Sequence, residues 1–308
     1  MFFSGRSLGV EIYQDGCSFL LSSGRRVAPV IDKFETAVFP ADSLRLSIKE
    51  TNIADPAVLH PMLLEAYTRL GTDLKRVSLS IPDLCGRIMM LDMEVLPKSR
   101  KEGIEHVKWK LKKSFPVDLN DMHLDYQPLA TNEQGGAKVL AAVVSRGVIS
   151  GYEDLFTAIG LEPAFIDFST FNLYRLFAER LDVQDDLALV ILFRGNLTVM
   201  VFQDGFLDFH RSKSVIGSAG DPVKLYREVN SSLLVYSDSR GGVKPQRIFY
   251  FSAPAERHLL RSVIFEAAGI EPLLIDTDNF ISSSRQQVDR SILPEFLSAL
   301  GAATRGLA

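Results

Sequence analysis

The hydrophobic pattern up to residue 81 predicts a β-meander, a helix and one more strand. Three apolar stretches are separated by Asp-Gly and Ser-Gly sequences, which favour tight turns. The expected strands cover residues 8–13, 17–22 and 27–39. Apolar residues then recur at helical spacing between Asp55, an expected N-cap, and Gly71. Residues 77–81 alternate with a period of two, which is typical of a strand.

The second part of the chain repeats this order of elements. Its expected strands and helix cover residues 187–193, 197–202, 206–212, 222–236 and 247–251. Shifting the first meander by 180 residues places Tyr13 over Phe193 and Ser18 over Thr198. The two meanders therefore resemble each other in length and in pattern.

A short stretch also recurs almost unchanged. Residues 158–171 return as residues 267–280, with seven of fourteen positions identical. In each copy a helix ends at a glycine suited to a left-handed cap, and a proline follows before a short strand. A glycine and a proline after a helix are common, but the ungapped identity favours a duplicated α/β half.

Residues 83–145 differ from both halves. A strand, a helix and two strands are expected at residues 87–95, 98–114, 123–129 and 138–145. This βαββ pattern predicts a small inserted subdomain. The polar stretch 182–186 divides the rest, so the expected domains are 1–185, carrying the insertion, and 186–308.

Two tandem halves of this kind are the plan of the actin-like fold, which sugar kinases and heat-shock-70 proteins share. The expected fold class is therefore α/β, with two actin-like domains and an inserted βαββ subdomain. In that fold the two meanders grip phosphates across the cleft between the domains. The glycine–proline corners would be duplicated features of the scaffold.

Composition excludes several classes of protein. A net charge of −4 argues against nucleic acid as the main partner. The two cysteines form no disulfide framework or metal motif, and we expect buried, inert thiols. The longest apolar run, residues 187–193, is too short to span a membrane. With no secretory signal at the start, we expect a cytoplasmic protein; whether the natural chain continues into a membrane segment stays open.

Three segments resemble the PilM family of type IV pilus assembly proteins. They are residues 77–82, 107–127 and 160–167, and the Phe-Pro and Asp-Tyr-Gln sequences of the second are the most specific. The chain is also similar to FtsA-like division proteins and to the cytoplasmic part of GspL-type secretion proteins. The resemblance implies a cytoplasmic scaffold, peripheral at the inner membrane, that holds the tail of a PilN-type membrane protein. A pilus or secretion motor ATPase is a second expected partner, and the particular machine stays open.

The nucleotide elements depart from the pattern that actin-like ATPases share. There, an aspartate and, two residues later, a glycine order Mg²⁺ and admit the phosphate. This chain has Glu11 and Tyr13 in the first meander, and Ile191 and Phe193 in the second. The glycine pair expected after residues 247–251 is also missing. We therefore expect a pseudo-ATPase without a catalytic residue, cofactor or metal, although an active ATPase or kinase remains the alternative.

Other chemistry finds little support in the sequence. If a nucleotide does bind, the residues expected near it are Glu11, Asp15, Gly16, Gly195, Asn196 and Thr198. No P-loop, no histidine spacing suited to a metal and no nucleophile elbow occur. His210 and Arg211 at the end of a strand are interpreted as a surface pair rather than as catalytic residues.

The resemblance also places the partner's tail in a groove between the first domain and the insertion. The residues expected to contribute are Leu96, Pro97, Phe115, Pro116 and Val117. An extended peptide there would gain main-chain hydrogen bonds and side-chain pockets. The alternative for Phe115 and Val117 is simple burial within the insertion.

The expected helix 98–114 has an excess of five positive charges in an acidic protein. Its basic patch includes Lys108, Lys110, Lys112 and Lys113. One interpretation is a solvated helix face. The other is attraction to anionic lipids or to an acidic partner, since each basic residue near such a membrane contributes roughly 1 kcal/mol. Membrane contact is therefore expected to be indirect or through this helix.

Overall fold

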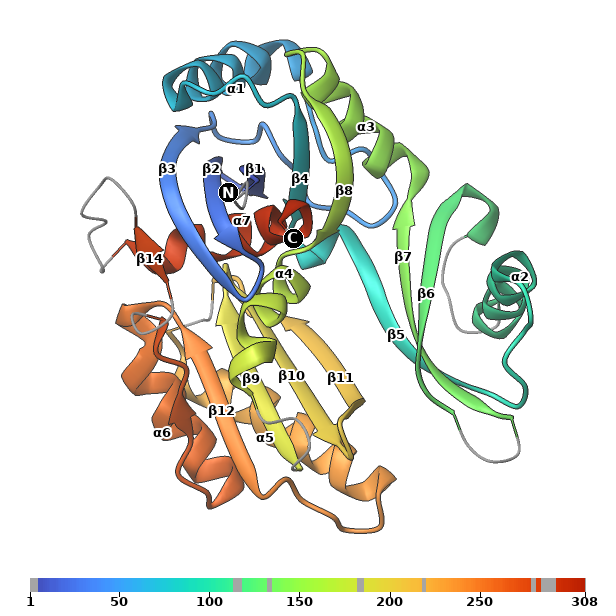
Figure 1. The fold of residues 1–308 in the computed structure, drawn as a ribbon. Helices are drawn as coiled ribbons and strands as arrows, with labels where there is room; N and C mark the ends of the chain where they lie inside the picture. Colours follow the sequence, from blue (N-terminus) through green and yellow to red (C-terminus); the bar gives the residue numbers. More distant parts are fainter. Residues whose placement is uncertain are drawn as a thin grey trace.

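A computed structural model describes residues 5–112, 118–131, 135–181, 186–217, 220–277, 281–283 and 292–307. Their strands form three β-sheets (Figure 1). Two sheets lie one above the other in the view, and the third projects to the side. Two helices lie between the first two sheets. None of the helices in these residues is long and apolar enough to cross a membrane.

The first sheet contains the predicted meander, and its strand order is β14-β3-β2-β1-β4-β8. Its strands are β1 Ser7–Tyr13, β2 Gly16–Arg25, β3 Ala28–Val38, β4 Arg76–Ile81, β8 Glu162–Phe168 and β14 Ser282–Ser283. The three strands of the meander pair in antiparallel fashion, whereas β4 and β8 continue the sheet in parallel with β1. The meander and the strand after it are therefore confirmed.

Helices α1 (Pro56–Leu70) and α3 (Arg146–Thr157) cover the outer face of the first sheet (Figure 1). The side chain of Asp55 accepts a hydrogen bond from the backbone of Ala57, and Gly71 ends α1 with a φ of 67°. These caps and the apolar stripe are those that the sequence predicts. The stripe residues Leu59, Leu63, Ala66, Tyr67 and Leu70 are all buried.

The second sheet has the same topology as the first. Its strands are β9 Leu187–Phe193, β10 Asn196–Gln203, β11 Phe206–Ser214, β12 Arg247–Ser252 and β13 Leu273–Leu274. Their order, β11-β10-β9-β12-β13, matches β3-β2-β1-β4-β8. Helices α5 (Pro222–Ser239) and α6 (Arg257–Ala268) cover the outer face. Gly160 and Gly269, with φ of 78° and 70°, make equivalent corners, so the duplication is confirmed.

Helices α4 (Ser169–Phe177) and α7 (Leu297–Ala303) join the two sheets through a shared apolar core. Helix α7 lies against β1 so closely that a Cβ on Gly9 would overlap the carbonyl oxygen of Ala299. On its other side, a Cβ on Gly301 would overlap the carbonyl oxygen of Asn172 in α4. The C-terminal helix thus completes the inner face of a sheet made from the start of the chain.

This packing also buries the polar face of β4. Ser78 and Ser80 alternate with Val77 and Leu79, and all four are buried. The hydroxyl group of Ser80 lies 2.6 Å from that of Ser298 in α7. Small hydroxyl side chains let the helix approach the sheet while satisfying each other's hydrogen bonds.

The insertion forms the third sheet, in the order β5-β7-β6. Its elements are β5 Gly86–Met93, α2 Arg100–Leu111, β6 Met122–Thr131 and β7 Ala137–Ser145. Helix α2 covers one face, and β11 of the second sheet contacts strands β5 and β6. The division of the chain into domains 1–185 and 186–308, with 83–145 inserted, stays a prediction.

Several ends of elements differ from the predictions. Helix α2 begins at Arg100 rather than at residue 98, because the Ser99 side chain caps the backbone of Glu102. Helix α3 begins at Arg146, directly after the last residue of β7. Single turns of 3₁₀ helix occur at Asp83–Cys85, Leu119–Asp121, Ala178–Arg180, Pro254–Glu256, Leu293–Phe296 and Thr304–Gly306.

Candidate functional site

The two β-turns that would grip phosphate face each other across the cleft between the first and second sheets. Arg194, in the β9–β10 turn, places its guanidinium carbon 3.8 Å from the ring centre of Tyr13 in β1. Its Nε lies 3.6 Å from a carboxylate oxygen of Glu11. Another nitrogen of the same group donates to the backbone oxygen of Glu295 at 3.3 Å. One side chain of the second half therefore binds three groups, including two on β1.

Glu11 is fully buried at this contact. Burial raises the pKa of Glu11 from an ordinary value of 4.5 to about 7, although the charge of Arg194 lowers it. Neither carboxylate oxygen has a hydrogen-bond partner among the described residues. The Glu11–Arg194 pair thus combines a Coulombic attraction with a carboxylate that prefers to be neutral.

Two sets of hydrogen-bonded side chains meet across the cleft beside this pair. Asp83, after β4, accepts hydrogen bonds from the backbone and the hydroxyl group of Thr170 in α4. The Thr170 hydroxyl lies 3.4 Å from that of Thr198 in β10. Thr198 also accepts a hydrogen bond from Asn196 and donates one to Ser212. Burial raises the pKa of Asp83, whereas the hydrogen bonds from Thr170 lower it. The contact between the hydroxyl groups of Thr170 and Thr198 thus brings α4 against β10.

Little space remains between the turns. The cavity lined by Glu11, Tyr13, Asp83, Phe193, Arg194 and Asn196 measures about 40 Å³. Sites for cofactors and small molecules usually measure about 300–1,000 Å³. In this geometry the cavity has room for a few water molecules.

The six residues expected near a nucleotide do not all meet. Glu11 and Asn196 line the cavity, and Thr198 joins it through hydrogen bonds. Asp15 lies exposed in the β1–β2 turn. Gly16 packs against the backbone of Ala37 and the ring of Tyr13, which leave no room for a Cβ. Gly195, with a φ of 70°, shapes the turn but does not line the cavity. Whether any of them binds a nucleotide stays a prediction.

Sequence reasoning missed Arg194, Asp83 and Thr170. The signal for Arg194 was its place in a tight turn directly after Phe193. It adopts a φ of 49°, which is uncommon for a residue other than glycine. Such conformations gather at functional sites. No local pattern marks Asp83 or Thr170, because their contact joins two distant parts of the chain.

The expected partner groove is only partly described. Phe115, Pro116 and Val117 lie outside the described residues. Leu96 and Pro97 are half-buried, and Leu96 packs on the apolar core of the insertion. The backbone N–H of Leu96 donates a hydrogen bond to the carbonyl oxygen of Gly135 at one end of the insertion. Gly86 lies at the other end, where it packs on Phe168 of the first sheet. Leu96 therefore lies at the end of the insertion that is remote from Gly86, and its part in a partner groove stays a prediction.

The basic helix α2 carries a further exposed residue. Lys112 is exposed and Lys110 half-buried, whereas Lys108 pairs with Glu105 at 2.9 Å. Lys113 lies outside the described residues. Between these lysines, Trp109 is 68% exposed and lies against His106.

The interpretation of His210 as a surface residue is wrong. Its ring stacks on Phe171 at 5.5 Å, and both ring nitrogens are buried without a hydrogen-bond partner among the described residues. Burial lowers the pKa of His210 to about 4. The face of β11 that carries it meets α4 rather than solvent, which the strand pattern alone could not show.

The two cysteines are buried, as the sequence predicts. Cys17 and Cys85 are free and buried. Burial raises the pKa of Cys85 to about 12, so its thiol is unreactive. No group of three or more histidine, cysteine or acidic side chains suited to a metal occurs in the described part of the chain.

Comparisons of the sequence with known families and with curated proteins give no match. The fold does match solved structures. A chain of the PilM–PilN type IV pilus biogenesis complex superposes with a TM-score of 0.80 at 18% identity, covering 98% of both chains. The cytoplasmic domain of EpsL, an inner-membrane component of the type II secretion system of Vibrio cholerae, gives 0.52 at 12% identity, covering 97% and 95%.

A third match is a protein of unknown function with an actin-like ATPase fold from Bacteroides thetaiotaomicron. The two superpose with a TM-score of 0.52 at 12% identity, and the match covers 89% of this chain and 91% of that protein's chain. These likenesses establish the fold. The predicted fold class is confirmed: the chain has the actin-like fold, and the resemblance to PilM holds over its whole length at the level of the fold.

Proposed function

We propose that this protein is a non-catalytic cytoplasmic scaffold of a type IV pilus or a related secretion machine. It would lie at the inner membrane and bind the cytoplasmic tail of a PilN-type protein. The supporting likenesses are to a PilM–PilN complex and to the cytoplasmic domain of EpsL, both from such machines. The interpretation of the cleft as a degenerate nucleotide site completes the proposal.

The contact of Arg194 with Tyr13 and Glu11 carries the second part of this proposal. In actin-like ATPases the corresponding turns leave their backbone amides open to phosphate. Here Tyr13 and Arg194 fill that space, and the residual cavity is about 40 Å³. Opening it would separate a buried ion pair and an aromatic contact, which costs free energy that nucleotide binding would have to supply.

Isothermal titration with Mg-ATP tests this part. We expect no heat of binding at micromolar nucleotide and no phosphate release. Micromolar binding, or turnover that a Glu11→Gln substitution abolishes, would instead favour the alternative of an active actin-like ATPase or kinase. A known actin-like ATPase, measured under the same conditions, serves as the positive control.

Binding of the partner is tested with a synthetic peptide that has the N-terminal tail sequence of a candidate PilN-type protein. We expect the full chain to bind this peptide and not a scrambled version. Leu96→Ser should weaken binding if the region of Leu96 and Pro97 contributes. Equal binding of both peptides, or of neither, would contradict the proposed partner.

Direct contact with the membrane through α2 is a further part of the proposal. The exposed Trp109 favours it, because tryptophan side chains are enriched at the interface between lipid and water. Lysines beside it would attract anionic headgroups. Flotation with anionic liposomes should fall for Lys110→Glu with Lys112→Glu, and remain for Lys224→Glu on α5. Unchanged flotation of the α2 variant would rule out this contact.

A further inference from the structure

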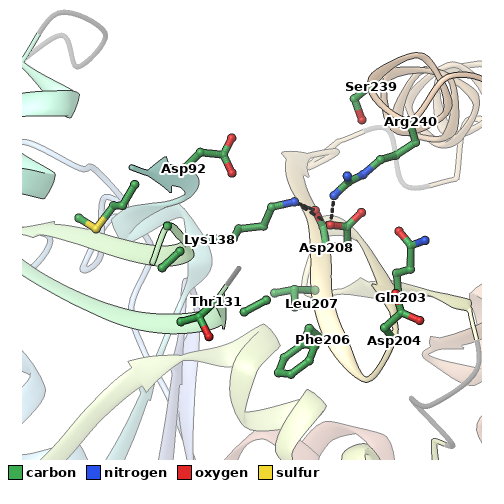
Figure 2. A pocket seen from close by; sticks show the side chains of 14 residues that line it. Asp92, Thr131, Lys138, Gln203, Asp204, Phe206, Leu207, Asp208, Ser239 and Arg240 are labelled. Carbon is green, nitrogen blue, oxygen red and sulfur yellow. Dashed lines mark hydrogen bonds and ion pairs between the residues drawn. The ribbon is translucent and has the colours of Figure 1, made fainter. Parts of the chain in front are cut away.

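A second cleft lies between the insertion and the β10–β11 hairpin (Figure 2). Its lining shares no residue with the cavity beside Arg194. Its volume is about 680 Å³, within the range of ligand-binding clefts. One wall consists of the ends of β5, β6 and β7. The other consists of the β10–β11 turn and the end of α5. The cleft is therefore formed by two separate parts of the fold, as many binding sites are.

Asp208 of β11 is the most buried charged group in its lining. Its side chain is 10% exposed, and its Oδ1 accepts hydrogen bonds from Lys138 at 2.6 Å and from Arg240. The Oδ2 atom is buried and has no hydrogen-bond partner among the described residues. A buried carboxylate oxygen normally has a donor. Both cations of the lining are already bound to Asp208, so neither is available to an anionic ligand.

The other charged residues of the lining are carboxylates. Asp92 lies directly opposite Lys138 in the β5–β7 ladder and is exposed. Asp204 lies exposed in the β10–β11 turn, with a φ of 50°. Figure 2 shows them on opposite walls. Three carboxylates thus outnumber two cations, and two of the carboxylates are exposed. This balance favours a cation.

Phe206 indicates which kind of cation. It is 49% exposed at the start of β11, next to the carboxylate of Asp204 along the turn. An exposed aromatic face beside carboxylates suits a guanidinium or ammonium group on an aliphatic stem. A bare metal ion would instead need several carboxylates converging on one point, and the described residues contain no such group.

We propose that this cleft binds a short lysine- or arginine-bearing segment of another polypeptide. A basic side chain pairs with Asp92 and Asp204, brings a donor toward Asp208, and lays its stem on Phe206. The source of the segment rests on the proposed function, since cytoplasmic segments next to membrane spans carry an excess of lysine and arginine. Leu96 and Pro97 are not among the residues that line this cleft.

Fluorescence anisotropy with the full chain tests the proposal. The probe is a short labelled peptide with lysine and arginine spaced by serine and glycine, and a matched peptide has glutamate at the same positions. We expect the basic peptide to bind and the acidic one not to bind. The double variant Asp92→Asn with Asp204→Asn should raise Kd roughly five- to tenfold, because it removes two exposed ion pairs.

Asp42→Asn is the matched control. Like Asp204, Asp42 is exposed and has a positive φ, of 62°, but it lies outside the cleft. Asparagine tolerates this conformation, so both variants should fold. Equal binding of the two peptides, no binding of the basic one, or a Kd that the double variant does not change would overturn the proposal. Because the peptide is synthetic, failure of the PilN-type partner to bind leaves this result unaffected.

Discussion

The guanidinium group of Arg194 stacks on the ring of Tyr13 at 3.8 Å and joins the two halves of an actin-like fold at the position where nucleotides usually do so. The stacked pair and the buried Glu11 beside it fill most of the cleft between the two halves. Several properties of the protein should depend on these side chains, and each can be measured.

Replacing Arg194 with alanine should raise the pKa of Glu11 above its value of about 7. Burial raises this pKa and the positive charge of Arg194 opposes it, so removing that charge leaves burial unopposed. Carbon-13 NMR of the labelled glutamate carboxyl groups reports the titration. Arg261→Ala, which removes a surface partner of Glu271, should leave the Glu11 titration unchanged. A lower pKa of Glu11 in Arg194→Ala would refute the assignment.

Glu11 should make the protein less stable as the pH rises. Its folded-state pKa, about 7, exceeds the ordinary value of 4.5, so the folded state binds the proton more tightly. The resulting stability is full below about pH 4.5 and is lost as the pH rises through about 7. The loss amounts to on the order of 3 kcal/mol.

Glu11→Gln should therefore lack this part of the pH dependence. Urea unfolding between pH 5 and 8 should show the variant gaining stability relative to the wild type as the pH increases. Glu65→Gln, at an exposed position on α1, is the control and should track the wild type. Parallel curves for Glu11→Gln and wild type would contradict the prediction.

His210 should act in the opposite direction. Its folded-state pKa, about 4, lies below the ordinary value of 6.5, so the stability it contributes is lost as the pH falls from 6.5 toward 4. His210→Phe keeps an aromatic ring on Phe171 and should resist acid better by on the order of 3 kcal/mol. Thermal unfolding at pH 4.5 and 7 measures the difference. The same change at the exposed His258 should have no such effect.

Gly9→Ala should destabilise the protein by about 3 kcal/mol, because the new methyl group would overlap the backbone of α7. Gly147→Ala in α3 is the matched control. Its methyl group would make only ordinary contacts, and alanine is favoured over glycine in a helix by up to about 1 kcal/mol. Urea unfolding compares the two. Equal stabilities would mean that α7 does not rest on Gly9.

Local chemistry made much of the fold predictable. Turn sequences, the Asp55 and Gly71 caps and the alternating strands depend on neighbouring residues, and the duplicated corners needed only comparison of the chain with itself. Tertiary contacts were beyond this reasoning. No local pattern marks Gly9, whose role is to admit a helix from a distant part of the chain.

At the candidate site, the sequence predicted only which residues of an actin-like ATPase are missing. The loss of the aspartate and glycine positions was visible in the sequence. The group that fills the space was not, because Arg194 and Tyr13 meet only after both halves have folded. His210 shows the same limit, since a strand pattern does not tell which helix will cover the strand.

The fit of α7 against Gly9 also has a consequence for biosynthesis. The ribosome makes β1 nearly 300 residues before it makes α7. Until α7 is present, the part of the inner face around Gly9 lacks the helix that covers it. Contacts between such distant segments form slowly, because a long loop must close first. A nascent chain therefore exposes this part of the sheet while the segments between β1 and α7 are made, and chaperones have access to it in that time.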